Sequence, residues 1–259
     1  MSWRGYRNLQ GLIMIGWVLF LLDKIDSGRL LLYINRRYVI LIALTAVAFF
    51  AVAQAVIGNK KKADHDHEDD DLSAVTEKNE QAEHAAHGRP PALGLLVLAL
   101  PLLLGVLLPA KTLDSSIVTN KGVNTRAPLS KISNAAVTSV SLASDQRSVM
   151  DWVGDFNSTS DLSSFQNQDA DVTGFVYHDV SLAKNQFLVS RFVVTCCVAD
   201  AIALGMVVDW PGGDKMSDNV WVEVQGPVYV AELGGQKLPG ITAHSVKTIQ
   251  TPDQPYIFP

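Results

Sequence analysis

The two cysteines of the chain are adjacent, within RFVVTCCVADA, and an aspartate follows three residues after the second one. A disulfide between neighbouring residues needs a strained ring, so this pair is a poor structural staple. Two thiolates and a carboxylate are ligands for Zn²⁺ and similar metals, and a histidine brought close by the fold would complete a four-ligand set. The pattern predicts a metal site drawn from Cys196, Cys197, Asp200, His178 and His244.

Two other interpretations of the cysteines remain open. Cysteines outside disulfides are among the most buried residue types, so both can be small core residues. The pair can also belong to a thiol redox protein that cycles between thiols and a Cys196–Cys197 disulfide. A nucleophilic thiolate needs a base or positive charge nearby, and the neighbours here are apolar or acidic. No P-loop, G-x-S-x-G, H-E-x-x-H or dinucleotide motif occurs in the sequence, so we expect no enzyme.

Four of the six histidines lie in a charged segment, residues 59–91, that has almost no large apolar residues. His65 and His67 lie within DHDHEDDD, and His84 and His87 are three residues apart, which places them on one face of a helix. A flexible loop loses conformational entropy when it binds, so these four histidines predict a weak and unselective cation site. The alternative is a solvated acidic tether between two membrane helices.

Three apolar runs predict membrane helices at about residues 6–22, 38–57 and 92–110. The second run has twenty residues without a charge, which matches the ~20 needed to cross a bilayer. Pro101 lies within the third run and predicts a kink. The first run is not expected to be a cleaved signal peptide, because Asp23 and Lys24 follow it without a small-residue cleavage pattern.

Three spans put the N-terminus and the 59–91 loop on one side of the membrane and the C-terminal part on the other. Lysines mark the cytoplasmic side, and Lys60, Lys61 and Lys62 follow the second span directly. We therefore expect a multi-pass protein of the cell membrane whose C-terminal domain lies outside the cytoplasm.

The C-terminal part predicts a linker, residues 111–144, and an all-β domain, residues 145–259. A short amphipathic helix is expected at 148–156, followed by five strands at 172–179, 187–199, 205–210, 219–232 and 240–250. Five strands with one long and bent at Gly226-Pro227 favour an OB-like barrel, and a small sandwich is the alternative. On the second strand one cysteine would point into the domain and the other out. Arg191 of that strand is expected to pair with Asp200 or Asp179.

The charge of this domain is unfavourable for nucleic-acid binding. From residue 110 to the end there are ten Lys and Arg against fifteen Asp and Glu, with no basic stripe. Many OB folds bind nucleic acids, but similarity of fold alone does not establish a function, so we expect no nucleic-acid partner.

The segments SGRLLLYINRR, NKGV, GFVYHD, SRFVVTCCVADA, WVEVQG and PDQPYIFP, taken with the histidine-rich loop and the apolar runs, resemble the YcgQ-like bacterial membrane proteins. The resemblance covers most of the chain, and the double cysteine is its most specific motif. It implies an accessory subunit whose gene lies beside a predicted permease, in a system sometimes associated with metal homeostasis. It supplies no catalytic residues.

These observations lead to the expectation of an accessory subunit of a membrane transport system, concerned with transition-metal homeostasis and paired with a permease. Zinc is the expected ligand. The competing class is a structural or interaction module that clamps the permease and in which both cysteines only pack.

Overall fold

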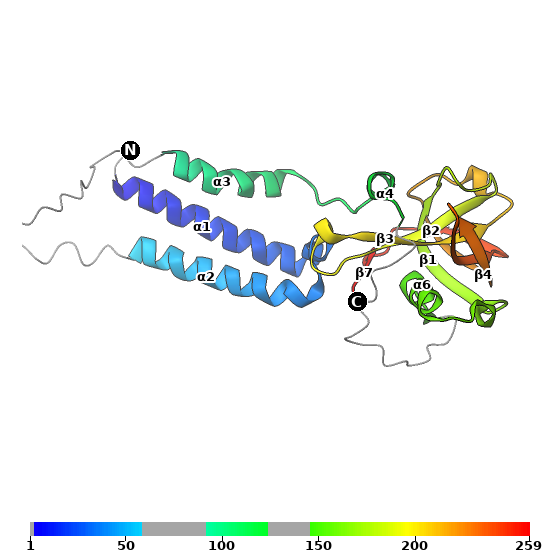
Figure 1. Ribbon diagram of the computed structural model, residues 1–259. Coiled ribbons are helices and arrows are strands. Elements are labelled where there is room, and N and C mark those ends of the chain that lie inside the picture. The colour runs from blue at the N-terminus through cyan, green and yellow to red at the C-terminus, as the bar shows by residue number, and fades with distance from the viewer. Residues whose placement is uncertain (1–2, 59–91, 124–145) are drawn as a thin grey trace, which may run out of the picture. The chain divides into compact units, whose positions relative to one another are not determined.

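The computed structural model describes residues 3–58, 92–123 and 146–259, and the chain divides into two compact units (Figure 1). Unit 1 comprises Met1–Leu30 and Arg37–Ala110. Unit 2 comprises Lys111–Pro259 together with the short segment Leu31–Arg36. The middle of the connection between the first two helices, residues 31–36, therefore belongs to the C-terminal unit.

Unit 1 contains three helices: α1 (Trp3–Asp26), α2 (Val39–Gly58) and α3 (Ala92–Leu107). The helix α1 packs against both of the others. The indole of Trp17 donates a hydrogen bond to the carbonyl of Leu98 at 3.0 Å, and Arg7 donates to the carbonyl of Val56 at 2.9 Å. Side chains of α1 thus hydrogen-bond to the backbone of both neighbours, a type of contact that links helices where water is scarce.

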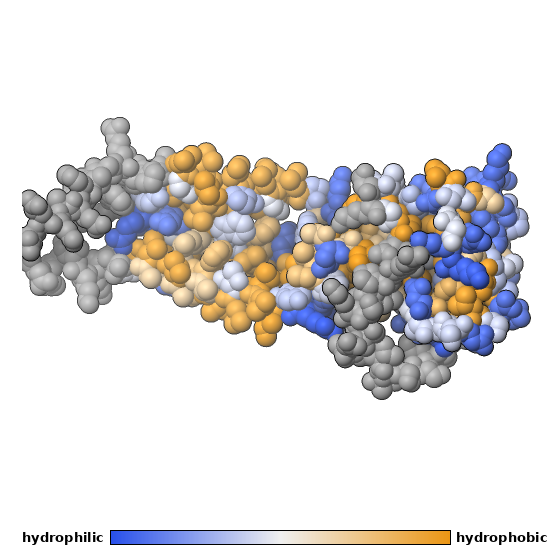
Figure 2. Space-filling view, viewed as in Figure 1, coloured by the Kyte–Doolittle hydropathy of each residue, from blue (hydrophilic) through white to orange (hydrophobic). Residues whose placement is uncertain are grey.

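Two of these helices are long and apolar enough to cross a membrane, over Gly5–Asp26 and Arg36–Gly58. The third, apolar over Leu93–Leu107, is shorter, so the prediction of three spans is not confirmed by length and composition. Pro101 lies inside α3, and the helix continues past it as expected. Figure 2 shows apolar residues over most of the visible surface of these helices.

The strands of unit 2 form one sheet whose first five members close a ring: β1 (Asp169–Tyr177), β2 (Gln186–Val193), β3 (Ile202–Asp209), β5 (Gln236–Thr242) and β4 (Trp221–Leu233). The pairing of β1 with β4 closes it. All pairs in the ring are antiparallel except β3 with β5. Outside the ring, β6 (Ser245–Ile249) pairs with β4 and β7 (Tyr256–Ile257) pairs with β2.

The ring is not a regular barrel, because its pairings differ greatly in length. Eight residue pairs join β2 to β3, whereas three join β3 to β5. Within the ring, β4 pairs with two strands along its length: residues 221–227 pair with β1, and residues 228–233 pair with β5. Gly226 lies where it changes neighbour, and a Cβ there would collide with the carbonyl oxygen of Thr242. The strand thus changes its partner at Gly226-Pro227, the position at which a bend was predicted, and a glycine is needed there for the close approach of the backbone.

Alternate residues of the strands fill the interior of the ring, and α6 (Val149–Ser158) packs against it. The helix was expected from its apolar spacing, and the four residues that define this spacing are all buried: Val149, Trp152, Val153 and Phe156. Ser148 caps its N-terminus in a capping box with Asp151.

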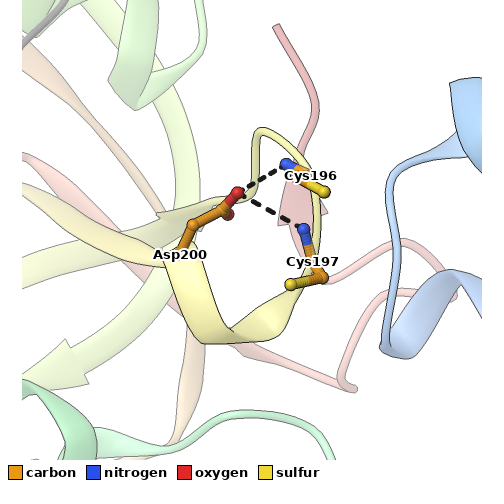
Figure 3. Close-up of side chains that lie close together, drawn as sticks. All are labelled: Cys196, Cys197 and Asp200. Atoms are coloured by element: carbon orange, nitrogen blue, oxygen red, sulfur yellow. Dashed lines mark hydrogen bonds between the residues drawn. The ribbon is translucent and has the colours of Figure 1, made fainter.

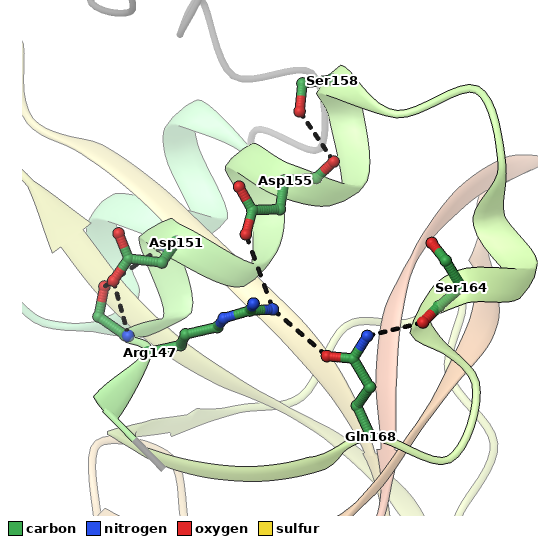
Figure 4. Close-up of polar contacts among 7 residues, drawn as sticks. Arg147, Asp151, Asp155, Ser158, Ser164 and Gln168 are labelled. Atoms are coloured by element: carbon green, nitrogen blue, oxygen red, sulfur yellow. Dashed lines mark hydrogen bonds and ion pairs between the residues drawn. The ribbon is translucent and has the colours of Figure 1, made fainter. Parts of the chain in front are cut away.

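A polar network holds the entry to α6 (Figure 4). The guanidinium of Arg147 lies 3.7 Å from the carboxylate of Asp155 and 3.4 Å from the side-chain oxygen of Gln168. The amide of Gln168 in turn donates to the carbonyl of Ser164 at 2.6 Å. These contacts link the two ends of the segment between the helix and β1.

Three predictions about the strands need correction. The second strand ends at Val193 rather than at 199, so the cysteines do not lie on it. The fifth predicted strand is two strands, β5 and β6, and β5 begins at Gln236, directly after a turn in which Gly234 and Gly235 have positive φ. All strands belong to a single sheet, which is not the two-sheet sandwich of the alternative.

Arg191 does not pair with Asp200 or Asp179. Its guanidinium donates to the carbonyls of Gln254 at 2.6 Å and Pro255 at 3.4 Å and lies over the ring of Trp221. Burial lowers the pKa of this guanidinium from its ordinary value. The residue therefore fixes the C-terminal segment against the ring.

Part of the predicted linker is ordered in unit 2. Asp114 caps α4 (Ser115–Lys121), and Val118 of that helix is fully buried. The backbone N–H of Leu113 donates to the hydroxyl of Tyr256 at 2.8 Å, and burial raises the pKa of this phenol. Residues 124–145 lie outside the described residues.

Candidate functional site

The two cysteines lie on the loop between β2 and β3, which we call the cysteine loop, Val194–Val198. Pairing of the two strands begins at Val193 opposite Ile202, so the residues between them form a closed turn. Cys196 is exposed and Cys197 is half-buried, and both are thiols. Neither belongs to the fully buried core, which makes them accessible to a ligand.

The carboxylate of Asp200 closes this loop from within (Figure 3). One of its oxygens accepts the backbone N–H of Thr195 at 3.1 Å. The other accepts those of Cys196 at 2.7 Å and Cys197 at 3.4 Å. A carboxylate that accepts several backbone N–H groups is held in place by charge-assisted hydrogen bonds. Asp200 therefore fixes the backbone of both cysteines.

The segment Leu31–Arg36 of unit 2 binds the cysteine loop mainly by donating hydrogen bonds to the carbonyls of the loop. The side-chain amide of Asn35 donates to the carbonyls of Val194 at 3.2 Å and Thr195 at 2.9 Å. The backbone N–H of Asn35 donates to the carbonyl of Cys196 at 2.9 Å. Ile34 and Cys197 form an antiparallel bridge. Sequence reasoning missed this contact, because the segment lies about 160 residues away and reads as part of a membrane hairpin.

Three of the five residues predicted for the metal site come together. The Sγ atoms of Cys196 and Cys197 and a carboxylate oxygen of Asp200 all lie within 4.8 Å of one another. Two thiolates and a carboxylate suit a borderline-soft ion such as Zn²⁺, and three protein ligands leave one position of a tetrahedron open. The three hydrogen bonds to Asp200 leave part of the acceptor capacity of its oxygens, about four lone-pair sites in total, for a metal.

The two histidines predicted for this site are not in the group. Both ring nitrogens of His178 are engaged, one with the carboxylate of Asp218 at 2.7 Å and one with the carbonyl of Gly213 at 3.0 Å. His244 is exposed in the turn between β5 and β6, where its backbone N–H donates to Gln225. His65, His67, His84 and His87 lie outside the described residues.

A cavity of about 350 Å³ adjoins the group, and Asp200 contributes to both. Its other walls are apolar or glycine, from α4 and its C-terminus and from β2 and β3: Ile117, Gly122, Phe192, Ala201, Ile202 and Ala203. Asp200 is the residue that the cavity shares with the group of the two cysteines.

Comparisons with known proteins cover both parts of the chain. The family model of the DUF1980 N-terminal domain matches residues 9–124, and that of the DUF1980 C-terminal domain matches residues 124–259. No solved structure matches.

Two relatives cover nearly the whole chain. The UPF0703 protein YcgQ of Bacillus subtilis is 26% identical, over 95% of this chain and 98% of its own length. A protein of Streptococcus mutans named "Putative two-component membrane permease complex subunit" is 24% identical, over 90% of this chain and 92% of its own length.

Proposed function

The chain belongs to the YcgQ-like DUF1980 family, and from that membership we propose that it is the accessory subunit of a two-component membrane permease system. The observation that carries the proposal is the name of the Streptococcus mutans relative, which matches over 90% of this chain. The apolar helices of unit 1 support it, because a permease subunit must meet its partner within the bilayer.

One face of α2 is suited to a partner helix. Ala46 and Ala53 are buried, and a rotation of 100° per residue places an exposed face on the opposite side of the helix. Towards the C-terminal end of α2 this face carries the small residues Ala48, Ala51, Ala55 and Gly58, with the amide of Gln54 at its edge, and the larger Leu44 and Val47 lie on the preceding turn. Small residues let helices approach closely in a membrane, and a polar side chain there is more stable against protein than against lipid.

Co-purification from the native membrane tests the pairing. We expect the tagged chain in mild detergent to retain one polytopic membrane protein in stoichiometric amount. An Ala51→Leu/Ala55→Leu variant should lose this partner, because larger side chains block close helix approach. The control is Val97→Leu, on an exposed position of α3. A chain that purifies alone, or a partner retained by both variants, contradicts the proposed surface or the pairing itself.

We propose that α3 is a third span, although it has only 16 residues, about 24 Å of helix. Leu31–Arg36 and Lys111–Pro259 belong to one unit and must lie on one side of the membrane. If α2 crosses the bilayer, the chain leaves that side after residue 36 and has to return to it before residue 111. The apolar helix α3 is the described segment that can make this crossing. The lysines at 60–62 then favour an extracytoplasmic unit 2.

We further propose an OB-like character for the ring of unit 2. The order β1–β2–β3–β5–β4, closed by β1, and the parallel pairing of β3 with β5 support it. In this domain the loop at the cysteines would bind a ligand and would not catalyse a reaction. Among the described residues no histidine belongs to the group of Cys196, Cys197 and Asp200, and histidine is a usual base for activating a thiol.

As a second candidate function we propose that this group binds a transition metal such as Zn²⁺, and that the histidine-rich loop gathers cations for it. The approach of the two sulfurs and the carboxylate supports the proposal. The Zn²⁺ affinity of the full chain in detergent, measured by calorimetry under reducing conditions, tests it. We expect one tight site that is lost in Cys196→Ser/Cys197→Ser and retained in Asp214→Asn, which alters an exposed carboxylate elsewhere.

A variant with all four loop histidines replaced by glutamine separates the two regions. It should lose the weaker binding and keep the tight site. Failure to bind in the wild-type chain, or equal binding by the double serine variant, would remove the metal role from the cysteines and leave the permease role untouched.

A further inference from the structure

We propose that Leu31–Arg36 is the second half of the cysteine site and that the state of the cysteines is coupled to the docking of this segment. This deepens the binding role proposed for the cysteine loop and rests on that role for its ligand. The coupling itself can be tested with or without a metal.

The cysteine loop is held from two sides by two different parts of the chain. Asp200 accepts the N–H groups of residues 195, 196 and 197. Asn35 donates to the carbonyls of residues 194, 195 and 196. The remaining groups are also paired, since the carbonyl of Cys197 accepts from Asp200 and the N–H of Val198 donates to Tyr33 at 2.9 Å. Every backbone polar group from the carbonyl of residue 194 to the N–H of residue 198 has a partner.

Because all of these groups are paired, any change in the backbone conformation of the loop must break hydrogen bonds. A metal held by both sulfurs and Asp200 would fix the loop in its present conformation, because these three ligand atoms already lie within 4.8 Å of one another. A bulky group attached to the half-buried Cys197 needs space beside Ile34, and we expect the backbone at Cys196 and Cys197 to rotate to provide it. Such a rotation turns the carbonyl of Cys196 away from the N–H of Asn35 and breaks the bridge between Ile34 and Cys197. The displaced contacts belong to the segment that joins α1 to α2.

The burial of Asn35 raises the free-energy cost of separating its segment from the cysteine loop. Its side chain is buried, with 2% of its surface exposed, so water is not at hand to replace the carbonyls of Val194 and Thr195. A buried amide that loses its acceptors carries the full cost of its desolvation. The state of the loop and the docking of Leu31–Arg36 are therefore linked equilibria, and each must shift the other by the same factor.

The closing experiment compares backbone hydrogen exchange of residues 31–36 in three samples of the full chain: untreated, with Zn²⁺, and alkylated with N-ethylmaleimide. We expect Zn²⁺ to slow exchange and alkylation to speed it, each by about tenfold, which corresponds to one or two hydrogen bonds. The Cys196→Ser/Cys197→Ser variant is the control for both reagents. Unchanged exchange in alkylated wild-type chain, with both cysteines shown to be modified, would mean a purely structural contact and would overturn the proposal.

The reciprocal measurement uses variants of the segment. Asn35→Asp keeps the size and the backbone N–H but sets a carboxylate against two carbonyls, so we expect alkylation of Cys196 and Cys197 to become about tenfold faster. Arg36→Ala, which changes an exposed neighbour, should leave the rate unchanged. Equal rates in all three chains would contradict the coupling. Should Zn²⁺ fail to bind, the metal role fails, while the alkylation results still decide the coupling.

Discussion

Asp200 has two tasks that compete for the same oxygens. It fixes the backbone of Thr195, Cys196 and Cys197, and its carboxylate lies within 4.8 Å of both sulfurs. A metal at the group would draw electron density from oxygens that already accept hydrogen bonds. The competition favours a site that binds and releases its ion over one that keeps it permanently.

The backbone task of Asp200 is open to a direct test. In Asp200→Asn one oxygen becomes an N–H donor that faces other donors, so the charge-assisted bonds are lost. Since Asp200 is partly exposed, we expect the free energy of unfolding to fall by about 1–3 kcal/mol. Denaturant unfolding followed by tryptophan fluorescence measures this change. An equal loss in Asp214→Asn would show that the effect is one of net charge.

The sequence allowed Cys196, Cys197 and Asp200 to be predicted as neighbours because they lie within five residues of one another. His178 and His244, predicted with them, are not in the group that the structure brings together, and residue type alone does not tell which loop of the ring a histidine occupies. The structure gives His178 a carboxylate partner, Asp218, that is 40 residues away. Asn35 could not be found at all, because nothing in a single asparagine after an apolar run marks a contact with a distant loop.

At the scale of elements, the local patterns were reliable and the ends of strands were not. The helix α6 followed from four apolar positions, and Gly226-Pro227 marked the point at which β4 changes its partner from β1 to β5. The apolar run after Val193 was mistaken for more strand. The N–H of Val194 still donates to Ile257 of β7, but the groups that follow are paired mainly by the side chains of Asp200 and Asn35. Such pairing by side chains leaves no periodic signal.

The cap of α6 gives a prediction at this scale. Ser148→Ala removes the side chain that accepts the N–H of Asp151 and should lower the free energy of unfolding by about 1 kcal/mol. Ser158→Ala is the matched control, because Ser158 is exposed at the other end of the helix and its hydroxyl donates to a carbonyl of its own turn. The shift in melting temperature of the two variants measures the difference. A larger shift for Ser158→Ala would contradict the importance of the capping box.

At the scale of the whole molecule, the proposal that α3 is a third span makes a prediction about which side of the membrane each connection lies on. The proposed third span predicts that position 28, in the connection of α1 to α2, and position 251, near the C-terminus, lie on one side of the membrane. Position 77, in the histidine-rich loop, should lie on the other. Single cysteines introduced as Gly28→Cys, Thr251→Cys and Glu77→Cys into a Cys196→Ser/Cys197→Ser chain can be labelled with a membrane-impermeant maleimide in sealed vesicles.

Labelling of positions 28 and 251 from the same side, with position 77 protected, is the expected result. The inverse pattern in inverted vesicles is the internal control. If all three positions react from one side, α3 does not cross the bilayer, and the short helix lies within or beside the membrane instead. The side on which position 28 reacts in intact cells also tests the orientation that the lysines at 60–62 favour.

Because Leu31–Arg36 belongs to unit 2, this segment is synthesised well before the rest of the unit that it packs with. A ribosome adds about 5–20 residues per second, so Asn35 exists roughly 10–30 s before Thr195, its partner about 160 residues later, has been made. During that interval the first two helices can insert, but the turn between them has nothing to hold. The last step of maturation is thus the capture of an early turn by a late domain, and a chain stalled before the cysteine loop would present that turn, uncovered, to the quality-control machinery of the cell.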